Sequence, residues 1–165
     1  MNELTAGDIW RLHEQLERDA SAILGRAIFA FSRLDANLGL MVASVLRVAG
    51  KVEQESKADG MNFHKRLEFI LKYACEAPDI DPSARAELTR WVKAADETRT
   101  QRNQLVHGRW DVDPYRRKAL NTVGLANSDE QRTFEYSLEE LESFVQRVND
   151  LQSQLTKVRM RWHLP

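Results

Sequence analysis

The chain has 165 residues, of which 42% are hydrophobic and 30% are charged, and its formal net charge at pH 7 is −1. This composition is typical of a soluble folded domain large enough to bury a core, and it excludes an intrinsically disordered chain. The near-neutral charge excludes a protein covered with positive charge for nucleic acid, so affinity for a polyanion must come from a local patch.

Features of the chain that report on its compartment favour the cytoplasm. The single cysteine, Cys75, excludes an internal disulfide framework and fits a reducing environment. The first residues lack the basic and apolar segments of a signal peptide, and no apolar run approaches the roughly 20 residues that span a bilayer. We therefore expect a cytoplasmic protein that does not contact the membrane.

The first half of the chain shows helical periodicity. Apolar residues recur at alternating steps of three and four, which predicts one long amphipathic helix over about residues 5–48. The residues that carry this pattern are Leu24, Ala27, Phe31, Leu34, Leu38, Met41 and Val45. A polar stretch from Gly50 to Gly60 predicts a loop, and a shorter helix follows over about 62–75.

Two later helices carry start and stop signals. Asp81 as the N-cap, with Pro82 at the first helical position, begins a helix over 82–107 that Gly108 ends. Ser137 and Glu140 form a capping box that begins the last helix, over about 137–160. In the insertion between them, residues 108–136, the helical period disappears, and residues 110–112 and 133–136 alternate like the strands of a small hairpin.

These elements predict a single all-α domain over residues 1–165. The expected architecture is a mostly up-and-down four-helix bundle with a long first helix and a short irregular or hairpin insertion before the last helix. The seven glycines are scattered, which excludes a Gly-rich phosphate loop. The four histidines lack metal-ligand spacing, so we expect no metal site and no cofactor.

The clearest candidate for a functional site lies at the end of the third helix. At about 100° per residue, Arg102 falls within about 20° of Trp91, in the middle of the apolar face of that helix. A guanidinium there must be paired, line a cleft or face a partner subunit, because an unpaired buried charge is costly. Asn103 and His107 lie four residues apart on another face, and His107 is about 140° from Arg102.

The surroundings of this site are basic and aromatic, which suits phosphates and bases. The residues that could bind a nucleic acid are Arg99, Arg109, Trp110, Tyr115 and the run Arg116, Arg117 and Lys118.

Each of these residues also has a structural interpretation. His107 suits the negative end of a helix dipole, Arg102 could pair with Asp35, and Trp110 could anchor the core. Asn103 and residues 116–118 could simply face solvent.

The pattern Arg102-Asn103-x-x-x-His107, extended by Leu105, Val106, Gly108 and Trp110, resembles the motif of the HEPN superfamily (higher eukaryotes and prokaryotes nucleotide-binding domain), in particular small bacterial HEPN-like proteins. The resemblance implies metal-independent RNA cleavage in a cleft between two protomers. His107 would then be the general base or acid, Arg102 would stabilise charge on the phosphate, and Asn103 would orient the phosphate or the histidine.

The same resemblance implies a homodimer with an RNA substrate. It also implies a role as a toxin or phage-defence effector, with an antitoxin or a nucleotidyltransferase-like protein as partner. Arg99, Arg109 and Trp110 would bind the substrate. Two alternatives stay open: a non-catalytic HEPN-like helical module for dimerisation and protein or nucleotide binding, and a structural bundle in which Arg102 is a satisfied interior ion pair.

Overall fold

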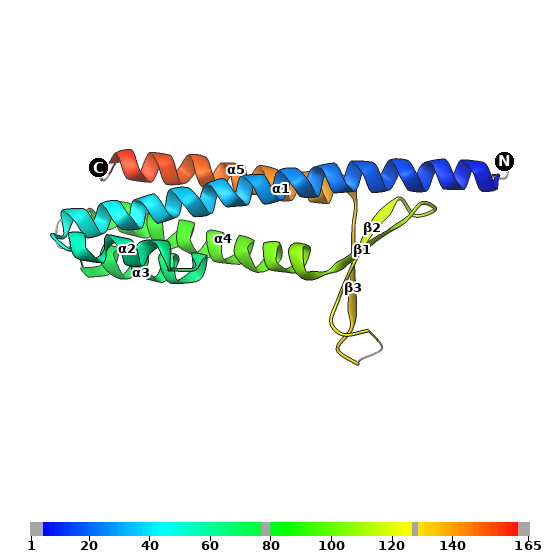
Figure 1. Ribbon diagram of the computed structural model, residues 1–165. Coiled ribbons are helices and arrows are strands. Elements are labelled where there is room, and N and C mark those ends of the chain that lie inside the picture. Colours follow the sequence, from blue (N-terminus) through cyan, green and yellow to red (C-terminus); the bar gives the residue numbers. More distant parts are fainter. Residues whose placement is uncertain (1–4, 77–79, 127–128, 162–165) are drawn as a thin grey trace. The chain divides into compact units, whose positions relative to one another are not determined.

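A computed structural model describes residues 5–76, 80–126 and 129–161 of the chain (Figure 1). The elements in chain order are α1 (Ala6–Val48), the 3-10 helix η1 (Val52–Gln54), α2 (Glu55–Asp59), α3 (Phe63–Glu76), α4 (Pro82–His107), β1 (Arg109–Asp113), β2 (Lys118–Val123), β3 (Arg132–Tyr136) and α5 (Leu138–Arg161). The chain divides into two compact units: unit 1 contains residues 1–29 and 101–146, and unit 2 contains residues 30–100 and 147–165. Helices α1, α4 and α5 contribute to both.

The prediction of an all-α fold is wrong, because the insertion before the last helix forms a three-stranded antiparallel sheet in the order β1-β2-β3. The four long helices begin and end within one residue of the expected bounds. Residues 110–112 and 133–136 do lie in strands, but β2 was not expected. The side chains that β2 buries are Ala119 and Asn121, while Leu120 is only half-buried, so no apolar alternation marks this strand.

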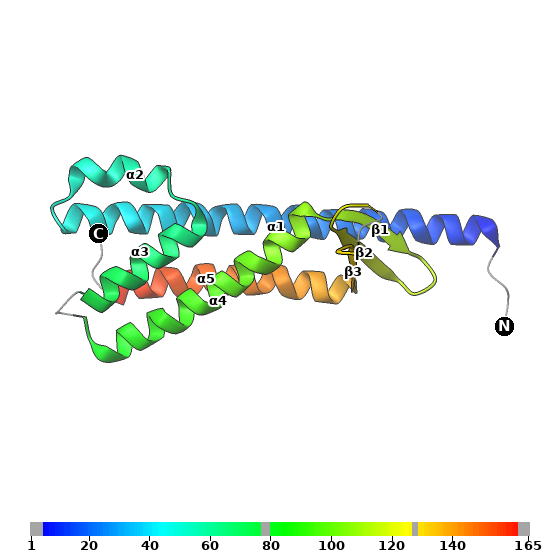
Figure 2. The same ribbon diagram turned by 90° about the horizontal axis from the view of Figure 1, so that it is seen from below.

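Unit 2 is a helical cluster built from the second part of α1, the first part of α4, the second part of α5, and the short helices α2 and α3. In both ribbon views α2 lies beside the C-terminal part of α1 (Figures 1 and 2). The indole Nε1 of Trp91 donates a hydrogen bond to the backbone oxygen of Leu151, 2.9 Å away, which joins α4 to α5. The fully buried large side chains of unit 2 include Leu34, Leu38, Met41, Val45, Leu67, Ile70, Leu88 and Leu155.

Arg66 of α3 joins three helices of unit 2. Its Nη1 donates to the backbone oxygen of Asp35 at 3.0 Å and lies 2.5 Å from Asp35 Oδ1 on α1. Its Nε and Nη2 donate to the backbone oxygen of Ala58 on α2, at 3.3 and 3.2 Å. The suggested pairing of Asp35 with Arg102 is therefore wrong, because Arg66 binds this carboxylate.

We expect Arg66→Met to lower the free energy of unfolding by about 2–3 kcal/mol, because it removes the charged donor of the Asp35 carboxylate and two of the donors to the Ala58 carbonyl, which keeps the hydrogen bond from Met61 N. Urea unfolding of the full chain measures this loss. Arg90→Met is the matched control, since Arg90 is an exposed arginine of the same unit. An equal loss in both variants would show that Arg66 does not hold the three helices together.

Unit 1 contains the three-stranded sheet, the first part of α1, the last turns of α4 and the first turns of α5. The predicted capping box is present at the start of α5: Ser137 N donates to Glu140 Oε2 at 2.6 Å, and Glu140 N donates to Ser137 Oγ at 3.2 Å. The hydrogen bond from the Ser137 backbone, and then the charge of Lys118, lower the pKa of Glu140. The buried apolar residues of the unit include Leu16, Ala20, Ile23, Ala27, Leu105, Val112, Leu141 and Phe144.

Helix α1 contains a stretch long and apolar enough, by length and composition, to cross a membrane. The expectation that no apolar run approaches the length of a membrane span is therefore wrong. The core helix of a soluble protein passes the same test, and α1 buries Leu34, Leu38 and Met41 completely in the core. The helix is therefore consistent with a soluble protein.

Candidate functional site

The three residues of the motif lie in the part of α4 that belongs to unit 1. Arg102 is half-buried and lines a mostly apolar pocket of about 210 Å³. Its Nη1 donates to Asn103 Oδ1 at 3.2 Å, so the carboxamide helps to orient the guanidinium. The other residues that line this pocket are Leu24, Ala27, Ile28, Leu105, Val106, Trp110 and Phe144. Of the three settings expected for Arg102, the structure therefore shows a cleft.

Apolar side chains at the pocket face solvent in this chain. Ile28 is 51% exposed and Val106 is 40% exposed. Large apolar side chains that cluster on a surface mark interaction sites more often than isolated ones do. We name the surface defined by Ile28 and Val106, which line the pocket, the apolar rim of the Arg102 pocket.

His107 is the last residue of α4, and its side chain is exposed. Within the described part of the chain, no hydrogen-bond or ion-pair partner of His107 is found. It is not among the residues that line the Arg102 pocket. A single chain therefore presents the arginine and the histidine of the motif in different surroundings, as their angular separation on the helix predicts.

The sheet holds the end of the motif helix. Trp110 Nε1 donates to the backbone oxygen of Leu105 at 2.9 Å, and this carbonyl is one of the last four of α4, which lack partners within the helix. The Trp110 ring also packs against Tyr136 of β3, with ring centroids 5.8 Å apart. Trp110 thus anchors the turn that carries His107, but it is only half-buried and is not one of the buried core residues, so it is not the core anchor that its structural interpretation supposed; it also lines the Arg102 pocket.

Gly108, between α4 and β1, is required because the Asn121 side chain lies close to its backbone, and not because the chain makes a left-handed turn there. Gly50 and Gly124 are the glycines with positive φ among the described residues, so Gly108 does not end α4 as a left-handed cap. A Cβ at Gly108 would lie 1.9 Å from Asn121 Oδ1. Asn121 is fully buried, and neither polar atom of its carboxamide has a hydrogen-bond partner within the described ranges. Asn121 was not among the residues expected at the site, because nothing local in the sequence marks an asparagine of β2 as a neighbour of Gly108.

The expected substrate-binding arginines differ in their surroundings. Arg99 belongs to unit 2, where its Nε donates to Asp96 Oδ1 at 2.7 Å. His64 Nδ1 lies 3.1 Å from the same oxygen. The hydrogen bond from Arg99, and then the one from His64, lower the pKa of the Asp96 carboxyl. Arg109, the first residue of β1, is exposed and belongs to unit 1 with the motif.

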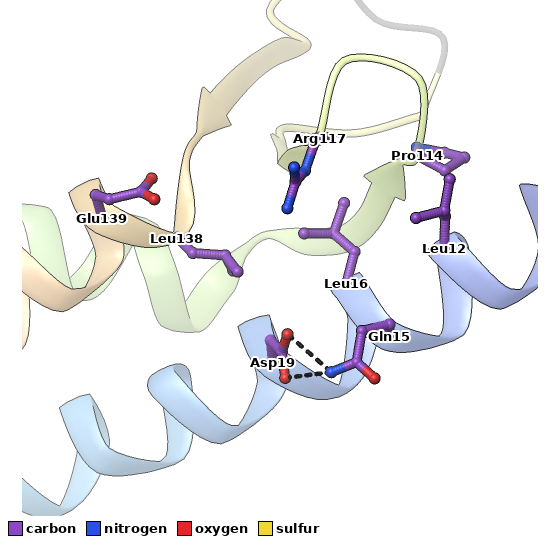
Figure 3. Close-up of a pocket in the computed structure, with 8 residues that line it drawn as sticks. All are labelled: Leu12, Gln15, Leu16, Asp19, Pro114, Arg117, Leu138 and Glu139. Atoms are coloured by element: carbon purple, nitrogen blue, oxygen red, sulfur yellow. Dashed lines mark hydrogen bonds between the residues drawn. The ribbon is translucent and has the colours of Figure 1, made fainter.

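The basic run after β1 is not a uniform solvated loop. Arg116 forms a two-point ion pair with Glu135, and Lys118 Nζ lies 3.5 Å from Glu140 Oε2. Arg117 has φ 51°, which is unusual for a residue other than glycine. Figure 3 shows its guanidinium directed into a pocket of about 350 Å³ that also holds Asp19 and Glu139. These two carboxylates oppose the binding of a phosphate there.

No group of three or more His, Cys, Asp or Glu side chains that could hold a metal ion is found in residues 5–76, 80–126 and 129–161.

Comparison with known proteins gives no match: no protein-family model, curated protein or solved structure is similar to this chain.

Proposed function

We propose that the chain is a metal-independent endoribonuclease of the HEPN type that acts as a homodimer in the cytoplasm. The observation that carries this proposal is the Arg102 pocket: a half-buried guanidinium, held by Asn103, opens on a surface of exposed apolar side chains. A second copy of the chain that covers the apolar rim would place the guanidinium in a cleft between two protomers. The motif resemblance then supplies the chemistry of that cleft.

The proposed reaction is transfer of an RNA phosphodiester to its own 2′-hydroxyl. His107 takes the proton of the 2′-hydroxyl as its oxygen attacks phosphorus, the bond to the 5′-oxygen breaks, and that oxygen accepts a proton from the His107 of the second copy. The products are a 2′,3′-cyclic phosphate and a 5′-hydroxyl. Arg102 donates hydrogen bonds to the phosphoryl oxygens as their negative charge increases in the transition state.

The remaining residues have supporting roles. Asn103 accepts a hydrogen bond from Arg102 and so limits the orientations of the guanidinium. Arg109 is exposed at the start of β1 and binds a neighbouring phosphate. Arg99 no longer carries a substrate role in this proposal, because it belongs to the other unit and is hydrogen-bonded to Asp96. A toxin or phage-defence role, with an antitoxin or nucleotidyltransferase-like partner, follows from the resemblance alone.

The test is cleavage of a labelled pool of tRNA and mRNA fragments in EDTA by the purified full chain, with its mass in solution measured alongside. We expect a dimer that cleaves RNA and leaves 2′,3′-cyclic phosphate ends. Ile28→Asp, a change on the exposed apolar rim, is expected to yield a folded monomer without activity. A dimer that cleaves no RNA would overturn the proposal and favour the non-catalytic dimerisation module. Activity that survives in an Ile28→Asp monomer would overturn the two-protomer site.

A further inference from the structure

Trp110 lines a second pocket in unit 1 in addition to the Arg102 pocket. The volume of this second pocket is about 150 Å³, and Leu24 also lines both pockets, so the two adjoin. The other residues that line it are His13, Glu17, Ala20, Ser21, Asp111 and Val112. We name it the His13 pocket. A group bound in the His13 pocket would therefore be separated from the Arg102 pocket only by the side chains that line both pockets, Leu24 and Trp110.

His13 lies between two carboxylates, one from its own helix and one from β1. Its Nδ1 is 4.0 Å from Glu17 Oε2, and its Nε2 is 3.9 Å from Asp111 Oδ1. Both distances exceed hydrogen-bond length, so the ring nitrogens are not bonded to these carboxylates. The Glu17 and Asp111 side chains are 70% and 76% exposed, and Asp111 Oδ1 accepts one hydrogen bond, from Val112 N. Most of the hydrogen-bonding capacity of the three residues is therefore open to a ligand.

The charges in the His13 pocket select against phosphate and for groups rich in N–H donors. Two carboxylates face one imidazole, so an anion is repelled there, whereas the cationic Arg102 lies in the adjoining pocket. The indole of Trp10 stacks on His13, with ring centroids 6.0 Å apart and planes at 10°, and adds an exposed aromatic surface. Aromatic surfaces and side chains that bond to base edges are the usual means of binding a single-stranded base.

We propose that the His13 pocket binds a guanine base of the RNA; this proposal rests on the proposed ribonuclease function and adds base specificity to it. The edge of guanine presents the acceptor O6 and then two adjacent donors, N1–H and the N2 amino group. A ring N–H of His13 can donate to O6 while the two Glu17 oxygens accept from N1–H and N2–H. Adenine, cytosine and uracil do not present two adjacent donors, so a carboxylate bonds to them less well. The scissile phosphate then lies next to the guanine, at the Arg102 pocket.

The first experiment measures binding without cleavage. Titration calorimetry of the full chain with guanosine 5′-monophosphate and uridine 5′-monophosphate is expected to give at least tenfold tighter binding of the guanine nucleotide. Glu17→Gln is expected to remove this preference, because an amide offers one acceptor and one donor where the base needs two acceptors. Glu14→Gln is the matched control, since Glu14 is another exposed glutamate of α1 that does not line the pocket. Both variants are compared with the wild type by thermal melting.

The second experiment maps cleavage sites in the RNA pool, where we expect cuts next to guanines in the wild type and loss of this bias in Glu17→Gln. Equal binding of both nucleotides, or equal behaviour of Glu17→Gln and Glu14→Gln, overturns the guanine pocket whether or not RNA is cleaved. Guanine-selective binding without RNA cleavage supports the pocket and overturns the ribonuclease. Cleavage without base bias, together with unselective binding, supports the ribonuclease and overturns the pocket.

Discussion

Replacing His107 with alanine is expected to lower the rate of RNA cleavage at least about 100-fold and to leave the melting temperature unchanged. A positioned acid or base contributes roughly 10²–10⁴-fold to a rate. The fold is expected to tolerate the change, because His107 is exposed at the end of α4 and its side chain has no partner among the residues that the structure describes. Single-turnover cleavage of one labelled RNA measures the rate, and circular dichroism measures the melt.

Arg102→Lys tests the proposed role of Arg102, which is to stabilise negative charge on the phosphoryl oxygens in the transition state. Lysine keeps the positive charge but loses the planar donors of the guanidinium, so we expect most of the activity to be lost. Arg18→Ala is the matched control, since Arg18 is an exposed arginine of α1 in the same unit that lines neither the Arg102 pocket nor the His13 pocket. Wild-type rates in His107→Ala or in Arg102→Lys would remove these residues from the reaction. A large loss in Arg18→Ala would show that general basic charge, rather than the motif, sets the rate.

Gly108→Ala is expected to lower the free energy of unfolding by about 3 kcal/mol, the upper part of the range for overpacking a folded core. The new Cβ would lie 1.9 Å from Asn121 Oδ1 and 2.4 Å from both Cγ and Nδ2, so the buried carboxamide or the backbone must move. For a chain of this size the melting temperature is expected to fall by roughly 10 °C. Chemical unfolding of the full chain gives the free energy.

Asn121→Ala is expected to rescue this loss. Asn121→Ala alone leaves a small cavity, but it also removes a fully buried carboxamide whose Oδ1 and Nδ2 have no hydrogen-bond partner within the described part of the chain. Because these two effects oppose each other, we expect the free energy of unfolding of this single variant to change by less than about 1 kcal/mol. In the double variant the space left by the carboxamide accommodates the new methyl group. Gly25→Ala, whose Cβ meets nothing within 4 Å, is the control and is expected to stabilise α1 by up to about 1 kcal/mol. Failure of Asn121→Ala to restore stability would show that the clash is not with this side chain.

The four long helices of this protein were predictable from the sequence, because the signals that begin them act within a few residues, whereas the short helices η1 and α2 lie in the segment expected to be a loop. Asp81 Oδ1 accepts a hydrogen bond from Ser83 N at 2.7 Å, as expected for the N-cap of α4, and this bond lowers the pKa of Asp81. The capping box at Ser137 and Glu140 is equally local. Helical periodicity alone placed Arg102 on the apolar face of α4, which required it to be paired, to line a cleft or to face a partner subunit. In the structure its side chain lines a pocket.

Contacts between residues distant in the chain were decided by the tertiary structure alone. Asp35 could have paired with several arginines, and only packing brings it to Arg66. Strand β2 lacked an apolar alternation, because one of the positions it buries is Asn121. The role of Gly108 depends on that same asparagine, 13 residues later in the chain. Likewise, His13 and Asp111 line one pocket because α1 packs on β1. The sequence by itself determined the four long helices, because apolar periodicity and helix caps are local signals, but it did not reveal η1 and α2 in the segment expected to be a loop. Which side chains meet was decided by the tertiary structure, because residues far apart in the chain are brought together only by packing.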